Sequence, residues 1–318
     1  MATISRAIKN PELLNAKTLK HVRSVISDLS YVPNVQARNL RTLRTGLVLV
    51  MVPDISRSIF SQVIRGVEKV AHANQYGVLL GDTQNDLSRE ETYYNFLSSR
   101  QVDGLITLIP RVPKLDLAEG WPIVNVGSYV DDDTVTRVHV DNVKAAREAT
   151  AVLIAMGHSC IGHLSGDPKS PVFHDRETGY RAALAEAGIE IPDSWVVPAT
   201  PTVEDGEMAA ELLLTRNPDI TAIVCSSDEM SVGAIRGVRK LGKQVPADVS
   251  IIGFGDTPMC RYSEPPMTTV AQPFGQMGEE AMRLLLEMLA APGSTPPRRR
   301  ILETQLVMRG STARNRRT

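Results

Sequence analysis

GLVLVMVPD, residues 46–54, is a continuous apolar run of strand length that ends in a turn. A run of this kind is typical of a strand buried on both faces of a sheet. Similar runs recur along the chain as YGVLLGD, DGLITLIP, PIVNVGS, RVHVD, CIGHLSG, TAIVCSSD and DVSIIGFGD, and helical patterns separate most of them. This alternation predicts βαβ units and parallel sheets covered by helices on both faces.

The number of apolar runs predicts more than one sheet. About ten strands exceed what one sheet comfortably holds, so we expect an α/β fold with two lobes and a break near Asp141. Ligands of open parallel sheets bind beyond the carboxyl ends of the strands. Polar residues stand at those ends here, among them Asp54, Ser128 and Ser227. Two lobes that face each other across such loops predict a cleft for a small polar molecule.

Charge is distributed unevenly along the chain. The whole sequence has 35 Lys and Arg against 36 Asp and Glu, but the first 45 residues have eight basic and two acidic side chains, which gives +6 there and −7 in the remainder. A basic head on an acidic body indicates that the head binds a polyanion. The sequence of this head predicts a helix at about 2–9 and a second helix at about 15–29, capped by Asn15.

Composition and motifs exclude several classes of protein. No apolar window is long enough to span a bilayer, and no signal peptide is recognisable, so we expect a cytoplasmic protein without a membrane partner. Cys160, Cys225 and Cys260 are widely spaced and are expected to be reduced thiols. The dinucleotide, P-loop and nucleophile-elbow motifs are missing from the sequence. We therefore expect neither an enzyme nor a cofactor.

Three polar groupings have simple structural interpretations. His158, Cys160 and His163 are spaced for a metal, but no second cluster in the sequence completes four ligands, so we expect a buried strand and no metal site. Residues Asp131–Asp133 and Arg298–Arg300 are expected in solvated loops. Asp228 is expected to cap the helix that it precedes.

Stretches from the whole chain resemble one family in order and spacing. They are ATISRAIKNPELL, LSYVPNVQARNLR, VPDISRSIFSQVIRGVE, HVDN, DRETGYRAAL, AIVCSSDEMSVGAI, LGKQVPADVSIIGFGD and PPMTTVAQP. Together they resemble the lactose/galactose repressor (LacI/GalR) family of bacterial transcription factors, and VPDI, IRGVE and IIGFGD resemble its cytidine-responsive branch. The resemblance implies a ligand-responsive, DNA-binding transcriptional repressor with a two-lobed core similar to periplasmic binding proteins.

The resemblance also implies a division of the chain into domains. Residues 1–32 would form a partial helix-turn-helix head, residues 33–45 a hinge helix and linker, and residues 46–318 the core that binds effector and dimerises. Within the core, the N-lobe would take about 46–140 and 270–292, and the C-lobe about 141–269 and 293–318. The family works as dimers or tetramers, which suits a palindromic operator bound by two related heads.

Carried over residue by residue, the resemblance assigns a DNA-binding set. Its members are Ala2, Thr3, Ser5 and Arg6 in the recognition helix, and Asn34, Ala37, Arg38 and Leu40 in the hinge. Thr3 and Ser5 are expected to contact phosphate or sugar, Ala2 and Arg6 to face bases, and Leu40 to wedge into the minor groove. The family's head begins with a further helix and turn, so we expect Met1 to be an internal methionine or the gene to be truncated. Operator DNA is accordingly expected as a partner if the head is complete.

The resemblance assigns an effector-binding set as well. Its members are Ile59, Phe60, Ser128, Phe173, Arg176, Ser227, Asp256 and Gln272. Arg176 is expected to donate hydrogen bonds to a nucleoside or sugar, and Phe60 or Phe173 to cover its apolar face. The family places Asp directly after the aromatic residue of a Gly-aromatic-Asp motif, whereas Gly255 follows Phe254 here. Either Asp256 substitutes from a shifted loop, or the effector is held differently.

Two other functions share the expected core fold. A solute-binding protein would carry an export signal and has no use for a basic head. A regulator that has lost DNA binding would act as an effector sink, and only an assay with DNA separates it from a repressor. The sequence leaves open whether the effector induces or co-represses.

Overall fold

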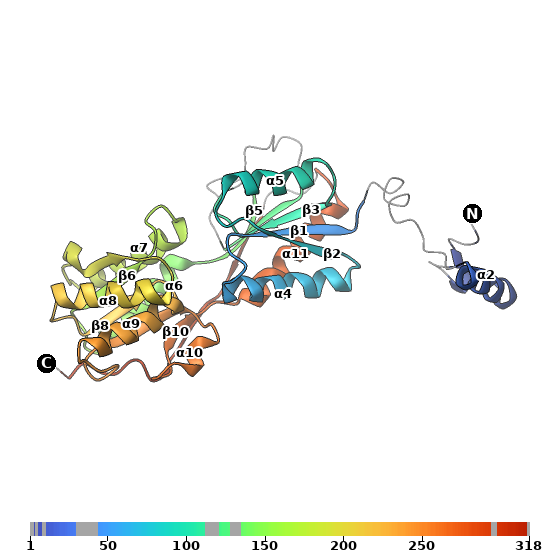
Figure 1. Ribbon diagram of the computed structural model, residues 1–318. Coiled ribbons are helices and arrows are strands. Elements are labelled where there is room, and N and C mark those ends of the chain that lie inside the picture. Colours follow the sequence, from blue (N-terminus) through green and yellow to red (C-terminus); the bar gives the residue numbers. More distant parts are fainter. Residues whose placement is uncertain are drawn as a thin grey trace. The chain divides into compact units, whose positions relative to one another are not determined.

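The computed structural model describes residues 3, 6–7, 11–29, 44–111, 121–127, 135–293 and 298–316. The chain divides into two compact units, Met1–Thr45 and Gly46–Thr318. Figure 1 labels many of the helices and strands of the two units, which are described here one at a time.

The first unit contains the helix α2, Ala16–Asp28, preceded by the short 3-10 helix η1, Pro11–Leu13. The Oδ1 atom of Asn15 accepts a hydrogen bond of 2.8 Å from the Thr18 backbone N–H, which confirms the predicted helix cap. Thr3, Arg6 and Ala7 are helical, and the remainder of the helix expected at 2–9 lies outside the described residues. Residues 30–43, which include most of the expected hinge, lie outside them too.

The second unit begins with a lobe built on a parallel sheet. Its strands run in the order β11-β5-β4-β3-β1-β2, and every pairing between neighbours is parallel. The strands are β1 Leu47–Val52, β2 Gly77–Asp82, β3 Gly104–Thr107, β4 Ile123–Val126, β5 Thr136–Val140 and β11 Arg299–Leu302. The opening apolar run is therefore an interior strand, β1, between β3 and the edge strand β2.

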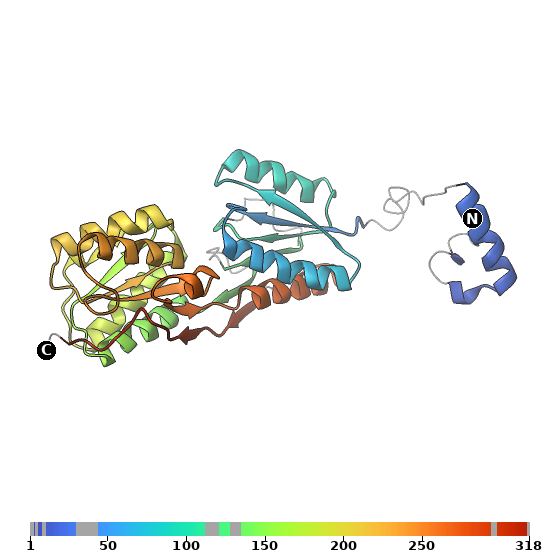
Figure 2. The ribbon, with the colours of Figure 1, turned by 60° about the horizontal axis from the view of Figure 1, so that its bottom comes forward.

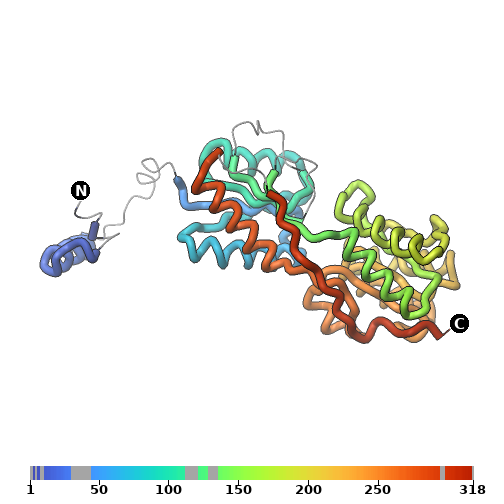
Figure 3. The backbone as a smooth tube through the Cα atoms, turned by 180° about the vertical axis from the view of Figure 1, so that it is seen from behind, coloured from blue at the N-terminus to red at the C-terminus, as the bar shows by residue number. Residues whose placement is uncertain are grey.

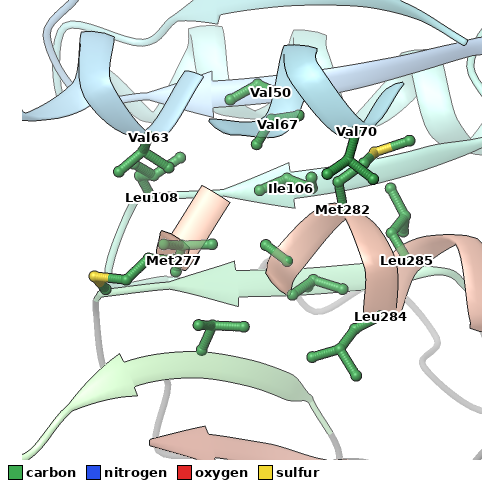
Figure 4. Close-up of a cluster of buried hydrophobic side chains, with 14 of the residues drawn as sticks. Val50, Val63, Val67, Val70, Ile106, Leu108, Met277, Met282, Leu284 and Leu285 are labelled. Atoms are coloured by element: carbon green, nitrogen blue, oxygen red, sulfur yellow. The ribbon is translucent and has the colours of Figure 1, made fainter. Parts of the chain in front are cut away.

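Helices cover both faces of this first sheet. Helices α4, Ser58–Ala73, and α11, Phe274–Ala290, pack on one face, and α5, Leu87–Ser98, packs on the other. Figure 2 shows α11 beside α4, although more than two hundred residues separate them. Figure 4 shows the core between these helices and the sheet, which includes Val67, Ile106 and Leu285. Burial of one such side chain stabilises the fold by about 1.5–3 kcal/mol.

Two glycines allow α4 and α11 to pack at close range. A Cβ added at Gly66 would lie 2.0 Å from the Gly275 carbonyl oxygen, and one added at Gly278 would lie 2.1 Å from the Val63 carbonyl oxygen. Both distances are far inside van der Waals contact. Any larger residue at Gly66 or Gly278 would therefore push the two helices apart.

A second lobe repeats this design. Its strands run in the order β12-β10-β9-β8-β6-β7, and only β12 is antiparallel to its neighbour. They are β6 Ile161–Ser165, β7 Val196–Pro198, β8 Ala222–Cys225, β9 Ser250–Gly255, β10 Thr268–Ala271 and β12 Gln305–Val307. Helices α6, Asn142–Ala155, and α7, Pro171–Glu186, cover one face, while α8, Val203–Arg216, and α9, Asp228–Lys240, cover the other. The 3-10 helix η3, Asp193–Trp195, and helix α10, Met259–Tyr262, complete the lobe.

The chain passes between the lobes three times, after β5, after β10 and after β11. Figure 3 shows green and red segments of the tube between the lobes. Two details differ from the expected division. Strand β11 lies in the first sheet, although residues 293–318 were expected in the C-lobe, and β10 keeps residues 270 and 271 in the second sheet. Arg299 and Arg300 are exposed but lie in strand β11, not in a loop.

The helices of the described residues are of moderate length. The longest of them, α11, has 17 residues. Across the described ranges, no helix combines the length and the apolar character that crossing a bilayer requires.

Candidate functional site

A cavity of about 540 Å³ lies where the carboxyl ends of the strands of the two lobes meet. Its walls come from loops after β1, β2, β3 and β4 in the first lobe, and from loops after β6, β7, β8 and β10 and the end of β9 in the second. Because these loops lead into helices, the N-termini of α4, α7, α9 and α11 all reach the cavity. The volume suits one small organic molecule.

Arg176, on α7, is the most deeply buried charge in the cavity wall and is 7% exposed. Its Nε donates a hydrogen bond of 3.0 Å to Asn142 Oδ1, and its Nη1 donates one of 2.6 Å to the Ser226 carbonyl oxygen. Burial, and then the nearby Arg57, lower the pKa of Arg176 to about 9. The guanidinium is therefore charged at neutral pH, while the two acceptors that hold it are neutral.

Aromatic rings surround the Arg176 guanidinium. Its central carbon lies 3.8 Å from the centroid of the Phe254 ring and 5.8 Å from that of Phe173. Phe173 in turn lies against Gly166, where an added Cβ would come within 2.1 Å of the ring. These contacts fix the guanidinium plane, which leaves its remaining N–H groups available to a bound molecule.

Arg57, in the first lobe, contacts a residue of the second lobe across the cavity. It is the N-cap residue of α4, and its Nη2 lies 3.9 Å from Glu229 Oε2 in the first turn of α9. Its guanidinium also lies 5.6 Å from the centroid of the Phe60 ring. The Arg57 Nε is buried and has no hydrogen-bond partner among the described residues.

Six residues of the expected effector-binding set line this cavity: Ile59, Phe60, Phe173, Arg176, Ser227 and Gln272. Ser128 lies outside the described residues. Ser227 also caps α9, because its Oγ accepts a hydrogen bond of 3.2 Å from the Met230 N–H. The cap expected from Asp228 is therefore wrong, and Asp228 is instead a fully buried residue of the first turn.

Asp256 does not line the cavity, contrary to expectation. Its φ of 57° lies in the left-handed region, and its Oδ1 accepts a hydrogen bond of 2.6 Å from Arg309 Nη2. The carboxylate is thus paired with a cation of the C-terminal segment. Phe254, two residues earlier, does line the cavity.

Sequence reasoning missed several charged residues of the cavity wall, namely Arg57, Arg111, Asp167, Lys169 and Glu229. Each follows a strand by a few residues, which is a usable signal in a parallel fold. Arg57 in particular stands two residues before Ile59, which was assigned to the site.

The metal-like cluster is structural. His158 Nδ1 lies 2.8 Å from Thr221 Oγ1, and its Nε2 lies 3.0 Å from the Ala313 carbonyl oxygen. His163 is fully buried, with Nδ1 2.9 Å from the Val224 carbonyl oxygen. Within the described ranges, no three His, Cys, Asp or Glu side chains gather closely enough to hold a metal.

The described part of the expected DNA-binding set is small. Thr3 and Arg6 are helical and exposed. The other members, Ala2, Ser5, Asn34, Ala37, Arg38 and Leu40, lie outside the described residues, as do Asp131–Asp133.

Comparisons with known proteins identify the family. Residues 150–312 match the model of a periplasmic binding protein-like domain. The HTH-type transcriptional repressor CytR of Escherichia coli (strain K12) is 34% identical over an alignment of 317 positions, which covers 98% of this chain and 92% of that protein. The chain belongs to the LacI family of transcriptional regulators. Catabolite control protein A of Priestia megaterium, also 34% identical, matches 91% of this LacI-family chain and 89% of its own length.

Solved structures of LacI-family regulators share the fold. The transcriptional regulator CelR–cellobiose complex superposes with a TM-score of 0.79 at 31% identity and covers 96% of this chain and 94% of its own. The LacI family regulator from Enterococcus faecium with bound ribose has a TM-score of 0.76 at 26% identity and covers 85% of this chain and 100% of its own. The chain is thus a ligand-responsive transcriptional regulator and not an enzyme, as the sequence predicted.

Proposed function

We propose that the chain is a repressor that binds operator DNA through residues 1–45 and adjusts its operator affinity to a small effector held in the cavity. The observation that carries this proposal is the cavity itself, because both lobes contribute to its wall. A molecule that contacts both lobes stabilises one arrangement of the lobes over others. Coupling of this kind between two sites is commonly about 1–3 kcal/mol, which changes affinity several-fold or more.

The chemical class of effector that we propose is a nucleoside or sugar, and Arg176 is the residue that we expect to hold it. The resemblance to the cytidine-responsive branch supports that class, as do the related structures described as complexes with cellobiose or with bound ribose. Phe60 and Phe173 would cover the apolar face of a sugar or base, as Phe173 and Phe254 already cover the guanidinium.

We propose that the protein is cytoplasmic and that its head, residues 1–45, binds bacterial operators. Arg6 would donate to guanine and Thr3 to phosphate, with Ala2 and Ser5 beside them. Asn34, Ala37, Arg38 and Leu40 would enter the minor groove. Replacement of Arg6 by Ala should weaken specific binding by about 1–3 kcal/mol and relax the sequence preference.

We also propose a homodimer, the smallest assembly that matches a two-fold operator. Strand β2 is at the edge of the first sheet, and its Leu79 and Leu80 are 36% and 43% exposed. An exposed apolar edge strand is a natural place for a second copy. Sedimentation of the wild-type chain and of the Leu80→Lys variant tests this, and a monomeric wild type would contradict it.

Gel shifts with DNA from upstream of the gene, at one stated salt concentration, test the function. Operator binding that changes several-fold on addition of a nucleoside or sugar is the expected result. Arg176→Gln should bind operator but lose the response, while Arg181→Gln, on the same helix but paired with Glu177, should keep it. Absence of specific DNA binding would favour an effector sink, and a response that survives Arg176→Gln would place the effector elsewhere.

A further inference from the structure

The charged residues in the cavity wall are predominantly cationic. Among the described residues that line it, Arg57, Arg111, Lys169 and Arg176 are basic, whereas only Asp167 and Glu229 are acidic. Arg111 is neutralised, because it forms a two-pronged ion pair with the buried Glu90. The question is which charges compensate the other three.

Arg176 has no ion pair with a carboxylate in the described part of the chain, because Asn142 and the Ser226 carbonyl are its acceptors. Asp228, the buried acid nearby, accepts hydrogen bonds from Thr257 and Thr269 instead. The hydrogen bonds of Arg176 thus go to neutral acceptors, while Asp228 and Glu229 favour its charge only through space. An anion at the free side of this buried cation would stabilise it further.

Arg57 is only loosely paired, since 3.9 Å separates its Nη2 from Glu229 and its Nε lacks a partner in the described ranges. Lys169 is exposed at the cavity mouth, and no described carboxylate forms an ion pair with it. Asp256, the acid nearest in sequence to Phe254, forms an ion pair with Arg309 instead. The cavity therefore holds more positive than negative charge.

Backbone dipoles add to this positive potential. Helices α4 and α7 both begin at the cavity, with Arg57 and Ser170 as N-cap residues, and neither residue caps its helix with a side-chain hydrogen bond. Helix N-termini carry partial positive charge and favour anions. Two such ends therefore reinforce the cations of the wall.

We propose that the effector carries an anionic group, a phosphate or a carboxylate, which binds between Arg57 and Arg176. The inference rests on the proposed function of the cavity as the effector site and narrows its ligand from neutral nucleosides and sugars to their charged derivatives. The anion would accept charge-assisted hydrogen bonds from both guanidinium groups. Because Arg57 belongs to the first lobe and Arg176 to the second, the same anion would join the lobes.

Calorimetry on the full chain tests this with matched pairs of compounds. The pairs are ribose and ribose 5-phosphate, cytidine and cytidine 5′-monophosphate, and glucose and glucuronate, with inorganic phosphate as a separate probe. In at least one pair, the charged member should bind at least about tenfold more tightly than the neutral one. The two phosphate pairs and the glucuronate pair then show whether the cavity prefers a phosphate or a carboxylate.

Two variants of one ion pair give opposite predictions. Arg57→Gln removes a cation and should reduce the charged-to-neutral preference, whereas Glu229→Gln removes the competing acid and should increase it. If the variants acted only by breaking the Arg57–Glu229 contact, both would change the charged-to-neutral preference in the same direction. Arg65→Gln, on the exposed side of α4, should leave the preference unchanged.

Three results would overturn the inference: equal or tighter binding of the neutral members, a preference that survives Arg57→Gln unchanged, or no binding by any charged probe, inorganic phosphate included. The operator gel shift reports on the proposed function separately. A neutral sugar that alters operator binding would therefore refute the anionic effector and leave the repressor function intact.

Discussion

Asp228 Oδ1 accepts a hydrogen bond of 2.6 Å from Thr269 Oγ1, which joins the first turn of α9 to strand β10. Its Oδ2 accepts a second bond, of 2.7 Å, from the Thr257 N–H. The backbone leaves room for this carboxylate at Gly253 and Gly255, where an added Cβ would lie 2.7 Å from one of its oxygens. One buried side chain thus ties the loop after β9 to helix α9 and strand β10.

Replacement of Asp228 by Ala should lower the free energy of unfolding by about 3 kcal/mol, because two buried donors lose their acceptor. Asn at this position keeps one acceptor oxygen and should fall between wild type and Ala. Urea denaturation measures the difference. The exposed Asp219→Ala variant should change stability by no more than about 0.5 kcal/mol, and a similar loss in both Ala variants would contradict this account.

The contact between α4 and α11 gives a matched pair of glycine substitutions. Gly66→Ala should destabilise the protein by about 2 kcal/mol, because its Cβ would meet the Gly275 carbonyl oxygen at 2.0 Å. Gly275→Ala meets nothing within 4 Å and should be neutral or stabilising by up to about 1 kcal/mol. Thermal unfolding of both variants checks this, and equal melting temperatures would show that the helices move apart freely.

Stability should fall in mild acid because of His163. Burial lowers the pKa of His163 to about 4, whereas the unfolded value is about 6.5. Between these values the unfolded chain binds a proton that the native chain does not, so the free energy of unfolding rises with pH. Above about pH 6.5, His163 no longer lowers the stability of the native chain. The free energy of unfolding should be about 2 kcal/mol smaller at pH 5 than at pH 7.

Urea denaturation at the two pH values measures this difference. His163→Gln should flatten the pH dependence without abolishing it, because burial also lowers the pKa of His158 and His139. The exposed His72→Gln variant should retain the wild-type slope. A steeper slope in His163→Gln than in wild type would show the sign to be wrong.

Thiol labelling of the native chain should be selective. Cys225 and Cys260 are fully buried, and burial raises the pKa of the Cys225 thiol to about 12 and raises that of Cys260 as well. The thiolate is the reactive form, so iodoacetamide at mildly alkaline pH should modify the partly exposed Cys160 first. Mass spectrometry of digested protein identifies the site, and early modification of Cys225 would contradict its burial.

Local patterns predicted the strands, the helices and much of the cavity. Continuous apolar runs such as residues 46–54 and 248–256 can be buried only as interior strands, and the loops after them had to meet at one edge. Ser227 stands at such a strand end, whereas Ile59 and Phe60 were assigned through the resemblance, and all three line the cavity. The cap at Asn15 followed in the same way from the residue before a helical pattern.

Features that depend on distant partners were not predictable. Strand β11 pairs with β5 from the other end of the core, and its short sequence does not specify that partner. Asp256 was expected in the cavity, but Arg309, more than fifty residues later, holds it outside. Charged loop residues such as Arg57 have no apolar periodicity to mark them, so only the assembled cavity shows that they face a ligand.

The position of α11 and β11 in the sequence has a consequence for synthesis on the ribosome. The first lobe contains the first strands to be made, yet the helix and edge strand that complete it are residues 274–302. All the strands of the second lobe except β12 lie between residues 161 and 271. The lobe translated second can therefore fold earlier, while one face of the first lobe's sheet stays partly uncovered until the last seventh of the 318 residues, which begins at α11, is made.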